Sequence, residues 1–392
     1  MNSYAKNQIS GNEVEYIRNF VLLGDPALQL AYPKYNVLTT QINGKKLNEG
    51  TDTISAMEPV EIKGFVADES GNKLNNFKGV LEIKVFDKTR ELTTLGTTPG
   101  DWPEEYLIQD NLIYQGQASV SNGEFTVNFI VPRDIDYSYG FGKISYYAND
   151  SLTDANGFCK QLVIGGSGNE STDNKGPQIE LFLDSPDFKD GGVTGSTPLL
   201  IAKLSDESGI NTLSNGIGHD IVATLDGNNS TSVVLNSFYN ADLNSYTSGV
   251  VLYKLAELIE GEHTLSLKAW DVFNNSSMAT INFKVSKNLQ ISITKVSVSP
   301  NPFNESIKIG FEINLADLPI EAHLEVFDIN GSLVNTSKTE SLLGQGYEAG
   351  ELTWDGRKNS GSIVPPGVYI VAVRASSGNS KTVKAVKVVK TK

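Results

Sequence analysis

Residues 80–87 read VLEIKVFD and decide the fold class, because apolar and charged residues alternate along them. This alternation predicts a strand with one face buried and the other in water. The stretches 123–131 (GEFTVNFIV), 307–313 (IKIGFEI) and 367–373 (GVYIVAV) are also typical of strands. Turn-forming clusters separate them, and no long helical pattern occurs from residue 35 onward. The sequence therefore predicts an all-β protein of tandem immunoglobulin-like β-sandwiches.

The length of 392 residues leaves room for three such sandwiches. A glycine-rich, polar stretch at 165–177 (GGSGNESTDNKGP) has almost no side chains to pack, so it predicts a linker. We expect a tail of a preceding domain at 1–32 and a β-sandwich at 33–166. A linker at 167–177, an immunoglobulin-like sandwich at 178–288 and a last sandwich at 289–392 complete the predicted order.

The charge balance excludes some classes of partner. A formal net charge of −14 argues against nucleic acid, which is bound through clustered Lys and Arg. The single cysteine excludes an intramolecular disulfide. No apolar run is long enough to predict a transmembrane segment, and the first residues do not have the pattern of an export signal.

Candidate catalytic side chains are few. Cys159 follows a turn and lies in a predicted strand, without the small-residue elbow that exposes a nucleophile, so we interpret it as a packed thiol. His263 and His323 lie at predicted strands and are interpreted as structural. His219 stands between Gly218 and Asp220, where an imidazole can be oriented or bind a metal, or simply bond to the backbone. A cryptic Cys159–His219 dyad stays open as an alternative.

Acidic loops predict, at most, a calcium site. Carboxylates cluster at 184–190 and at 206–209 (DESG), and loops of β-sandwiches can bind calcium through such oxygens. The spacing fits neither an EF-hand loop nor a zinc site, and no glycine loop for a phosphate precedes a helix. We therefore expect no cofactor, with calcium possible. The candidate ligands are Asp206, Glu207, His219 and Asp220.

Several motifs resemble known families. Residues 18–26 (RNFVLLGDP) resemble the closing segment of gingipain-like cysteine peptidase domains, so the tail is expected to be the remnant of an α/β peptidase domain. Residues 269–275 (AWDVFNN) resemble the last hairpin of bacterial immunoglobulin-like modules, in which Asp271 and Asn274-Asn275 would hold the turn. The motifs of the last module resemble FlgD-like immunoglobulin modules and the type A sorting domains of type IX secretion cargo: SPNPF at 299–303, LTWDGR at 352–357 and PGVY at 366–369.

The order of these motifs resembles the C-terminal part of the sortases of the type IX secretion system of Bacteroidetes. The resemblance implies a parent protein at the outer face of the outer membrane, which removes C-terminal sorting domains from cargo and attaches the cargo to the cell surface. It also implies the outer-membrane β-barrel protein PorV as a partner. In that family the catalytic Cys and His precede the tail motif, and a signal peptide would lie upstream. The resemblance therefore predicts a non-catalytic accessory region with no catalytic residue of its own.

Two further questions stay open at this point. A secreted gingipain-like peptidase cargo, with the last module as its cleaved sorting signal, would carry similar motifs. The basic last strand is a candidate docking surface for the partner, because it contrasts with the acidic remainder of the chain. Lysines on an edge strand also prevent aggregation between edges, which is the alternative role. The docking candidates are Lys384, Lys387 and Lys390.

Overall fold

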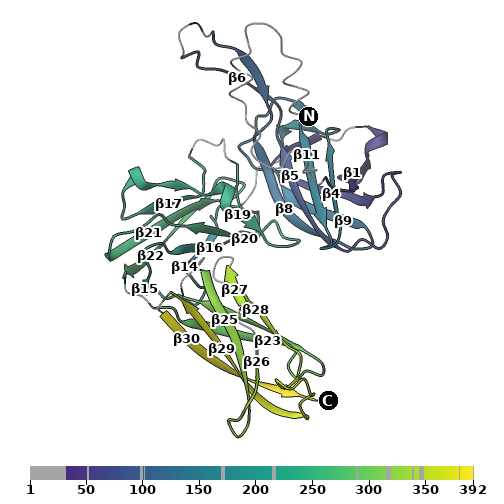
Figure 1. The fold of residues 1–392 in the computed structure, drawn as a ribbon. Helices are drawn as coiled ribbons and strands as arrows, with labels where there is room; N and C mark the ends of the chain where they lie inside the picture. The colour runs from purple at the N-terminus through teal and green to yellow at the C-terminus, as the bar shows by residue number, and fades with distance from the viewer. Residues whose placement is uncertain are drawn as a thin grey trace, which may run out of the picture.

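The computed structural model describes residues 32–391 except 51–52, 98–99, 101, 169–172, 214–217, 288–289, 315–318, 338–339, 344–347 and 379. The predicted peptidase remnant at 1–32 therefore lies almost entirely outside the described residues. Within these ranges the chain forms strands and three short 3₁₀ helices, η1 (Leu47–Glu49), η2 (Asn229–Thr231) and η3 (Asn236–Phe238). The described part contains no α-helix and hence no helix long and apolar enough to cross a membrane. The predicted all-β class is confirmed (Figure 1).

We call the sheets of β1–β13 the first module. A large sheet has the order β8-β5-β11-β12-β1-β4-β9, with β2 paired to β1, and a smaller one has the order β10-β13-β3. In β5 the residues Leu81, Ile83 and Val85 are buried while the charged residues between them are exposed, as the alternation predicted. The strands are β1 (Tyr35–Ile42), β2 (Lys45–Lys46), β3 (Thr53–Ala56), β4 (Pro59–Ala67), β5 (Gly79–Phe86), β6 (Arg90–Thr93), β7 (Glu105–Ile108), β8 (Leu112–Val120), β9 (Glu124–Ile130), β10 (Gly140–Phe141), β11 (Lys143–Asn149), β12 (Asp154–Cys159) and β13 (Val163–Ser167).

The second module, β14–β22, consists of two sheets with the orders β14-β16-β20-β19 and β15-β22-β21-β17-β18. Leu200, Leu204, Leu265 and Phe283 from the two sheets meet in one core, as in a β-sandwich. The strands are β14 (Gln178–Leu183), β15 (Gly192–Thr194), β16 (Leu199–Ser205), β17 (Val222–Leu225), β18 (Val233–Val234), β19 (Tyr239–Ala241), β20 (Ser248–Lys254), β21 (Gly261–Trp270) and β22 (Ser276–Val285).

The third module, β23–β30, has sheets of order β23-β24-β28 and β26-β25-β29-β30, with β27 paired to β25. The ring of Trp354 lies between those of Phe303 and Tyr369, at centroid distances of 5.4 and 5.5 Å, and fills the core. The strands are β23 (Ile293–Ser299), β24 (Ile307–Ile313), β25 (Pro319–Asp328), β26 (Leu333–Thr336), β27 (Glu340–Leu343), β28 (Glu348–Trp354), β29 (Gly367–Ser377) and β30 (Ser380–Lys390).

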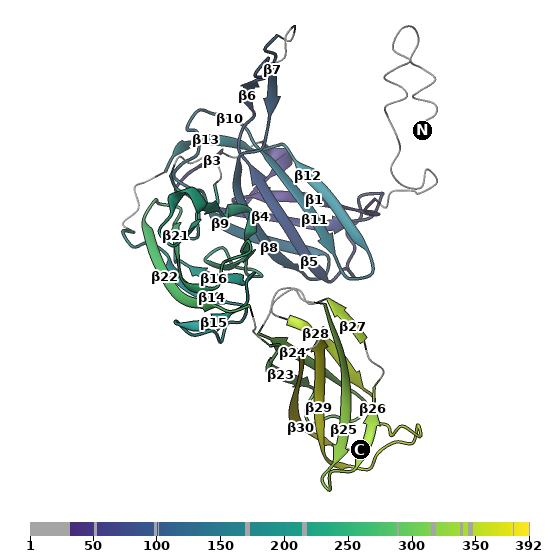
Figure 2. The same ribbon diagram turned by 60° about the vertical axis from the view of Figure 1, so that its left-hand side comes forward.

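The first and second modules are in direct contact. Asn244, which precedes β20, accepts hydrogen bonds on Oδ1 from the amide and hydroxyl of Ser119 in β8, at 2.8 and 3.1 Å. The backbone amide of Asn244 donates a hydrogen bond to the backbone carbonyl of Gln117 at 2.9 Å. The side chains of Leu213 and Tyr246, which belong to the second module, pack against the core of the first module. In Figures 1 and 2 the third module lies at the opposite end of the molecule from β6 and β7.

Ile309, whose side chain is fully buried in β24, tests the core of the third module. Replacing it with Ala removes buried methyl groups and leaves a cavity, so Ile309→Ala should lower the free energy of unfolding of this module by about 2–5 kcal/mol. The loss of stability is measured by urea unfolding, followed by the fluorescence of the buried Trp354. The other two of the three tryptophans are replaced by Trp102→Phe/Trp270→Phe, so that only Trp354 contributes to the signal. The exposed neighbour provides the control: Lys308→Ala should cost less than about 1 kcal/mol. Equal losses for both variants would contradict the packing.

Candidate functional site

The turn between β21 and β22 is held by a buried carboxylate. Asp271 is fully buried, and its Oδ1 accepts hydrogen bonds from the amides of Phe273 and Asn275 at 3.0 and 2.7 Å. Its Oδ2 accepts a third from Asn275 Nδ2 at 2.7 Å. Asn274 has a φ of 71°, a left-handed conformation that Asn tolerates. The interpretation of these residues as the ones that hold the turn is confirmed.

The same turn ties the second module to the first. The carbonyl of Val272 accepts a hydrogen bond from the amide of Arg133 at 2.8 Å. Asn274 Nδ2 donates to Asp134 Oδ1 at 2.7 Å. Arg133 and Asp134 lie after β9 in the first module, so these two bonds cross the junction between modules. We call this contact the junction turn, residues 271–275.

His219 belongs to this junction rather than to an exposed metal site. Its Nδ1 lies 2.6 Å from Asp134 Oδ2, and its ring packs on Trp270 with centroids 4.4 Å apart. Asn211 Nδ2 donates to the same Asp134 oxygen at 3.4 Å. Three side chains of the second module, those of Asn211, His219 and Asn274, thus form hydrogen bonds with the carboxylate of Asp134. Residues 216 and 217, which precede Gly218 and His219, lie outside the described part.

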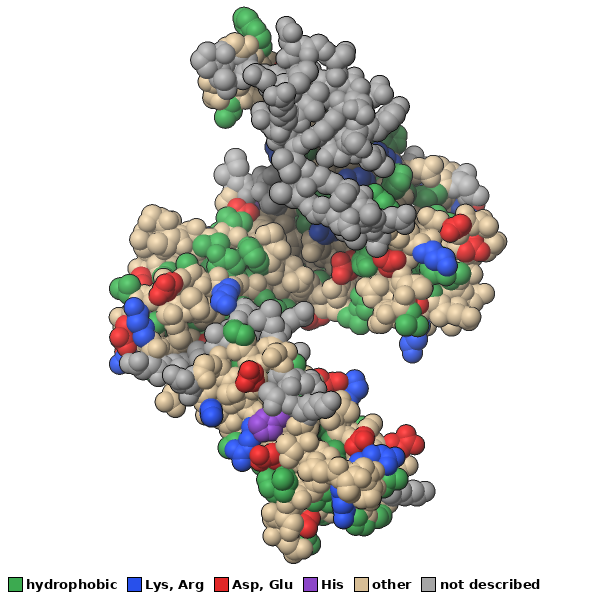
Figure 3. Space-filling model, in the orientation of Figure 1, with side chains coloured by type: hydrophobic (Ala, Val, Ile, Leu, Met, Phe, Trp, Pro, Cys, Tyr) green, Lys and Arg blue, Asp and Glu red, His purple; other side chains and the backbone are tan. Residues whose placement is uncertain are grey.

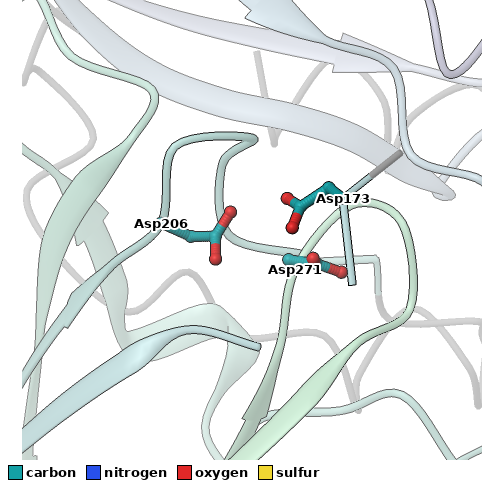
Figure 4. Close-up of side chains that lie close together, drawn as sticks. All are labelled: Asp173, Asp206 and Asp271. Carbon is teal, nitrogen blue, oxygen red and sulfur yellow. The ribbon is translucent and has the colours of Figure 1, made fainter. Parts of the chain in front are cut away.

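The predicted metal ligands do not form one group. Burial raises the pKa of the Asp220 carboxyl, although the hydrogen bond that it accepts from Asn236 Nδ2 at 3.1 Å opposes this. Asp206 instead lies beside Asp271 and Asp173, and one oxygen of each lies within 4.8 Å of the others. Figure 4 shows the three side chains close together, from the linker, the loop after β16 and the junction turn. We call them the acidic cluster.

The three carboxyl groups of the acidic cluster differ in proton affinity. Burial, aided by repulsion from Asp271 and Asp173, raises the pKa of Asp206 to about 6. Burial also raises the pKa of Asp271, opposed by its bonds to Asn275. The hydroxyl of Ser208, which donates to Asp173, and the amide of Lys175 lower the pKa of Asp173. In mildly acidic solution Asp206 therefore binds a proton, whereas Asp173 keeps its charge.

An open hollow of about 550 Å³ adjoins the acidic cluster. Asp173, Asp206 and Glu207 line it together with Lys175. Carboxylate oxygens are the ligands that calcium prefers, but calcium takes six to eight oxygens, and this cluster alone supplies fewer. Calcium binding thus stays a prediction from the sequence. Asp173 and Asp271 were missed as members of the cluster, because nothing in the sequence indicates that the linker and the junction turn meet.

The proposed dyad is not brought together. Cys159 is buried in β12, opposite Ile144 in β11, as the packed-thiol interpretation expected. No hydrogen bond joins its sulfur to His219 within the described residues, and Nδ1 of that imidazole is engaged by Asp134. His263 bonds to Asp226 and to the carbonyl of Ile259 instead. The described part of the chain therefore contains no nucleophile paired with a histidine base.

The three candidate docking lysines occupy different environments on β30. Lys387 is exposed. Lys384 is also exposed, and its ammonium donates to the carbonyl of Thr294. Lys390 is only 4% exposed; its ammonium donates to the carbonyl of Asn304 at 2.5 Å and lies 5.5 Å from the centroid of the Phe303 ring. The expectation that Lys390 faces a partner is wrong, because its side chain closes the end of the third module.

The raised pKa of Asp206 predicts a pH dependence of the second module. Since the folded-state pKa lies above 3.8, the folded module binds a proton here more readily than the unfolded chain, and stability falls as the pH rises from about 4 to about 6. Asp206→Asn keeps the acceptor for the Ser208 amide and removes the charge. We expect it to raise the free energy of unfolding by about 1 kcal/mol at pH 7.5, and not at pH 4, since partial exposure screens the repulsion.

Urea unfolding followed by Trp270 fluorescence in a Trp102→Phe/Trp354→Phe background, in buffer without divalent cations, measures this difference. Asp187→Asn is the control, because Asp187 is exposed in the same module and its carboxylate accepts no hydrogen bond from a described residue. A pH profile of Asp206→Asn that parallels the unmodified chain would contradict the raised pKa.

Asp134→Ala removes the acceptor that three side chains of the second module share. Hydrogen bonds to charged groups contribute about 1.5–3 kcal/mol, so the second module should lose stability in this range. Small-angle X-ray scattering should give a larger radius of gyration, because the two modules separate. The control is Asp136→Ala on the same loop, whose carboxylate bonds to Ser138 within the first module. An unchanged radius of gyration in Asp134→Ala would show that the junction does not depend on this carboxylate.

Comparisons with known proteins agree with the motifs of the sequence. Residues 297–379 match the family model of the FlgD Ig-like domain. The dimeric latent PorU of Porphyromonas gingivalis is 29% identical, with 94% of this chain and 35% of that chain covered and a TM-score of 0.44. The chain thus spans about a third of the PorU chain. No curated protein matches.

Two other solved structures are much less similar. A Salmonella alpha-2-macroglobulin mutant is 9% identical, with 92% of this chain and 25% of that chain covered and a TM-score of 0.22. The tandem repeats of a large adhesion protein are 13% identical, with 92% and 74% covered and a TM-score of 0.22. Neither likeness carries a functional argument. The resemblance predicted from the sequence is confirmed: the chain is similar to PorU over nearly its whole length and has a FlgD Ig-like domain in its third module.

Proposed function

We propose that this chain is a non-catalytic accessory region of a type IX secretion sortase, which positions a peptidase domain and docks cargo or a membrane partner. The observation that carries the proposal is the similarity to PorU across 94% of a chain whose described residues contain no cysteine–histidine pair. The parent protein would act at the cell surface, on the outer face of the outer membrane. Its reaction would remove the C-terminal sorting domains of cargo and attach the cargo to the surface.

The junction turn supports a positioning role. A scaffold that presents a peptidase domain needs modules with a fixed mutual orientation, and flexible linkers alone do not supply one. Here backbone and side-chain bonds of Arg133 and Asp134 join the first module to the second. The additional contact of Asn244 with β8 lies at a second point, and two separated contacts restrict rotation between the modules.

The third module is the proposed docking element for PorV. Its β30 pairs with β29 as a strand, and at its end Lys390 also forms a parallel bridge with Phe303. Lys384 and Lys387 remain exposed on it, whereas the whole chain carries a net charge of −14. A basic strand on an acidic protein favours an acidic loop of the partner by long-range attraction. Protection of the strand edge from aggregation remains the alternative role of these lysines.

Lys384→Ser/Lys387→Ser tests the docking role with purified PorV. We expect the dissociation constant to rise about tenfold at low ionic strength and the difference to shrink at high salt, because exposed charges are screened. Lys78→Ser/Lys189→Ser, at exposed lysines of the first and second modules, is the control with the same change of charge. Equal binding by both double variants would contradict docking through β30.

The non-catalytic role is tested separately. The purified chain should not cleave cargo that carries a sorting domain, and cleavage that disappears in Cys159→Ala would establish the dyad instead. The cargo alternative predicts a different product in the native organism. Mass spectrometry of the mature protein would then show loss of the residues from about 289 onward. A mature protein that retains these residues favours the accessory region.

A further inference from the structure

The ribbon β6–β7 projects from the first module as a separate two-stranded sheet. It continues the pair β5–β8 beyond Phe86, the last β5 residue that pairs with β11. Within the described residues β6 pairs only with β7, so the outer edge of each strand has no neighbouring strand. Figures 1 and 2 show the ribbon extending away from the rest of the module.

The base of the ribbon is fixed. The guanidinium of Arg90 binds the carboxylate of Asp110 through two hydrogen bonds, Nε to Oδ1 at 3.0 Å and Nη2 to Oδ2 at 2.9 Å. Gln109 Nε2 donates to the carbonyl of Asp87 at 2.8 Å. Beyond the strands, the amide of Thr94 donates to the carbonyl of Glu104 at 2.9 Å. The ribbon is therefore anchored to the module and regular along its length.

The two faces of the ribbon differ in chemistry. Residues opposite each other in the register share a face, so Leu92, Tyr106 and Ile108 lie on one face. Arg90 lies on the same face, where Asp110 binds its guanidinium. Leu107 lies on the opposite face, across from Glu91. Glu91 and Glu105 lie on the other face. No ion pair engages Glu91, Glu104 or Glu105 within the described part of the chain.

Large apolar side chains along the ribbon are exposed to solvent. Leu95 is 86% exposed, Trp102 83%, Leu107 69% and Tyr106 46%. Figure 3 shows hydrophobic side chains at the end of this projection. An isolated hairpin is marginally stable in water, and a regular strand with an open edge is a template for pairing with another chain. Anchored open strand edges beside exposed apolar side chains are typical of a binding surface.

We propose that the β6–β7 ribbon binds an extended segment of a protein partner, which adds as a strand to one of its open edges. In an added strand, successive side chains point to opposite faces. The face of Leu92, Tyr106 and Ile108 accepts apolar side chains of the segment, and the Glu91–Glu105 face accepts lysines or arginines. The segment that fits therefore alternates apolar and basic residues. This inference is independent of the docking role proposed for the third module.

The negative charge of the ribbon disfavours two other binding partners, a lipid surface and a second copy of this chain. An anionic lipid surface repels the unpaired carboxylates of Glu91, Glu104 and Glu105. A second copy of this chain carries the same net charge of −14 and the same acidic ribbon. Both occupants are outcomes of the test below.

The test selects peptides on the complete chain. Random peptides of about 12 residues, twice the length of a typical strand, are displayed on phage and selected on the immobilised protein. We expect enriched sequences that alternate apolar residues with Lys or Arg. Synthetic versions, measured by fluorescence anisotropy, should bind at least tenfold more weakly to Glu91→Lys/Glu105→Lys, since opposite charge becomes like charge. Tyr106→Ser should weaken them by a similar factor.

Backbone pairing has its own readout. N-methylation of every second residue of an enriched peptide removes the amides along one edge while leaving its side chains in place. Methylation of the pairing edge should abolish binding, and methylation of the opposite edge should not. If methylation of neither edge of the peptide weakens binding, strand addition is overturned.

Two control variants match the charge and the apolar changes. Glu69→Lys/Glu82→Lys changes two exposed glutamates of the first module, and Leu152→Ser replaces a side chain that is 92% exposed on the same module. Both should bind the peptides as the unmodified chain does. Equal binding by the ribbon variants, enrichment without alternation, or no enrichment would overturn the proposal.

Assays for the other occupants complete the test. Cosedimentation with vesicles of phosphatidylcholine and anionic phosphatidylserine that disappears in Trp102→Ser would assign the ribbon to a lipid surface and overturn the proposal. Analytical ultracentrifugation that detects a dimer, lost in Tyr106→Ser, would assign it to a second copy and do the same.

Discussion

The buried carboxylate of Asp271 is the constraint on which the arrangement of the first two modules depends. A charged group without solvent contact is costly unless hydrogen bonds compensate it, and here three donors of the junction turn do so. Those bonds fix the position of Val272 and Asn274, which then reach Arg133 and Asp134 of the first module. A local turn motif thereby determines a contact between modules.

The junction turn also separates two electrostatic environments. On one side, the carboxylate of Asp134 forms hydrogen bonds with one imidazole and two side-chain amides, and these bonds compensate its charge. On the other side, Asp206 and Asp173 face Asp271, and mutual repulsion adds to burial. We therefore expect protonation in the acidic cluster to change the stability of the second module, and the carboxylate of Asp134 to support both its stability and its attachment. This division suits a scaffold that keeps its geometry while its surroundings change.

Local patterns were sufficient for much of the fold. Alternation in β5 and β24 predicted the buried faces, and the AWDVFNN motif predicted the turn that Asp271 holds. Long-range partners were beyond such patterns: Asp134 and Asn274 are separated by 140 residues, and no local rule pairs them. Lys387 and Lys390 are three residues apart and so lie on opposite faces of β30. The sequence did not show that the segment of Phe303 and Asn304 covers the face of Lys390. Of the predicted metal ligands only Asp206 joined a cluster, whose other members were not foreseen.

The central claim is that the first and second modules form one unit with a fixed orientation. Double electron–electron resonance between spin labels at Leu152→Cys and Ile259→Cys, in a Cys159→Ser background, tests it most directly, because both sites are exposed and lie on different modules. The account predicts a single narrow distance distribution. A broad or multimodal distribution would contradict it.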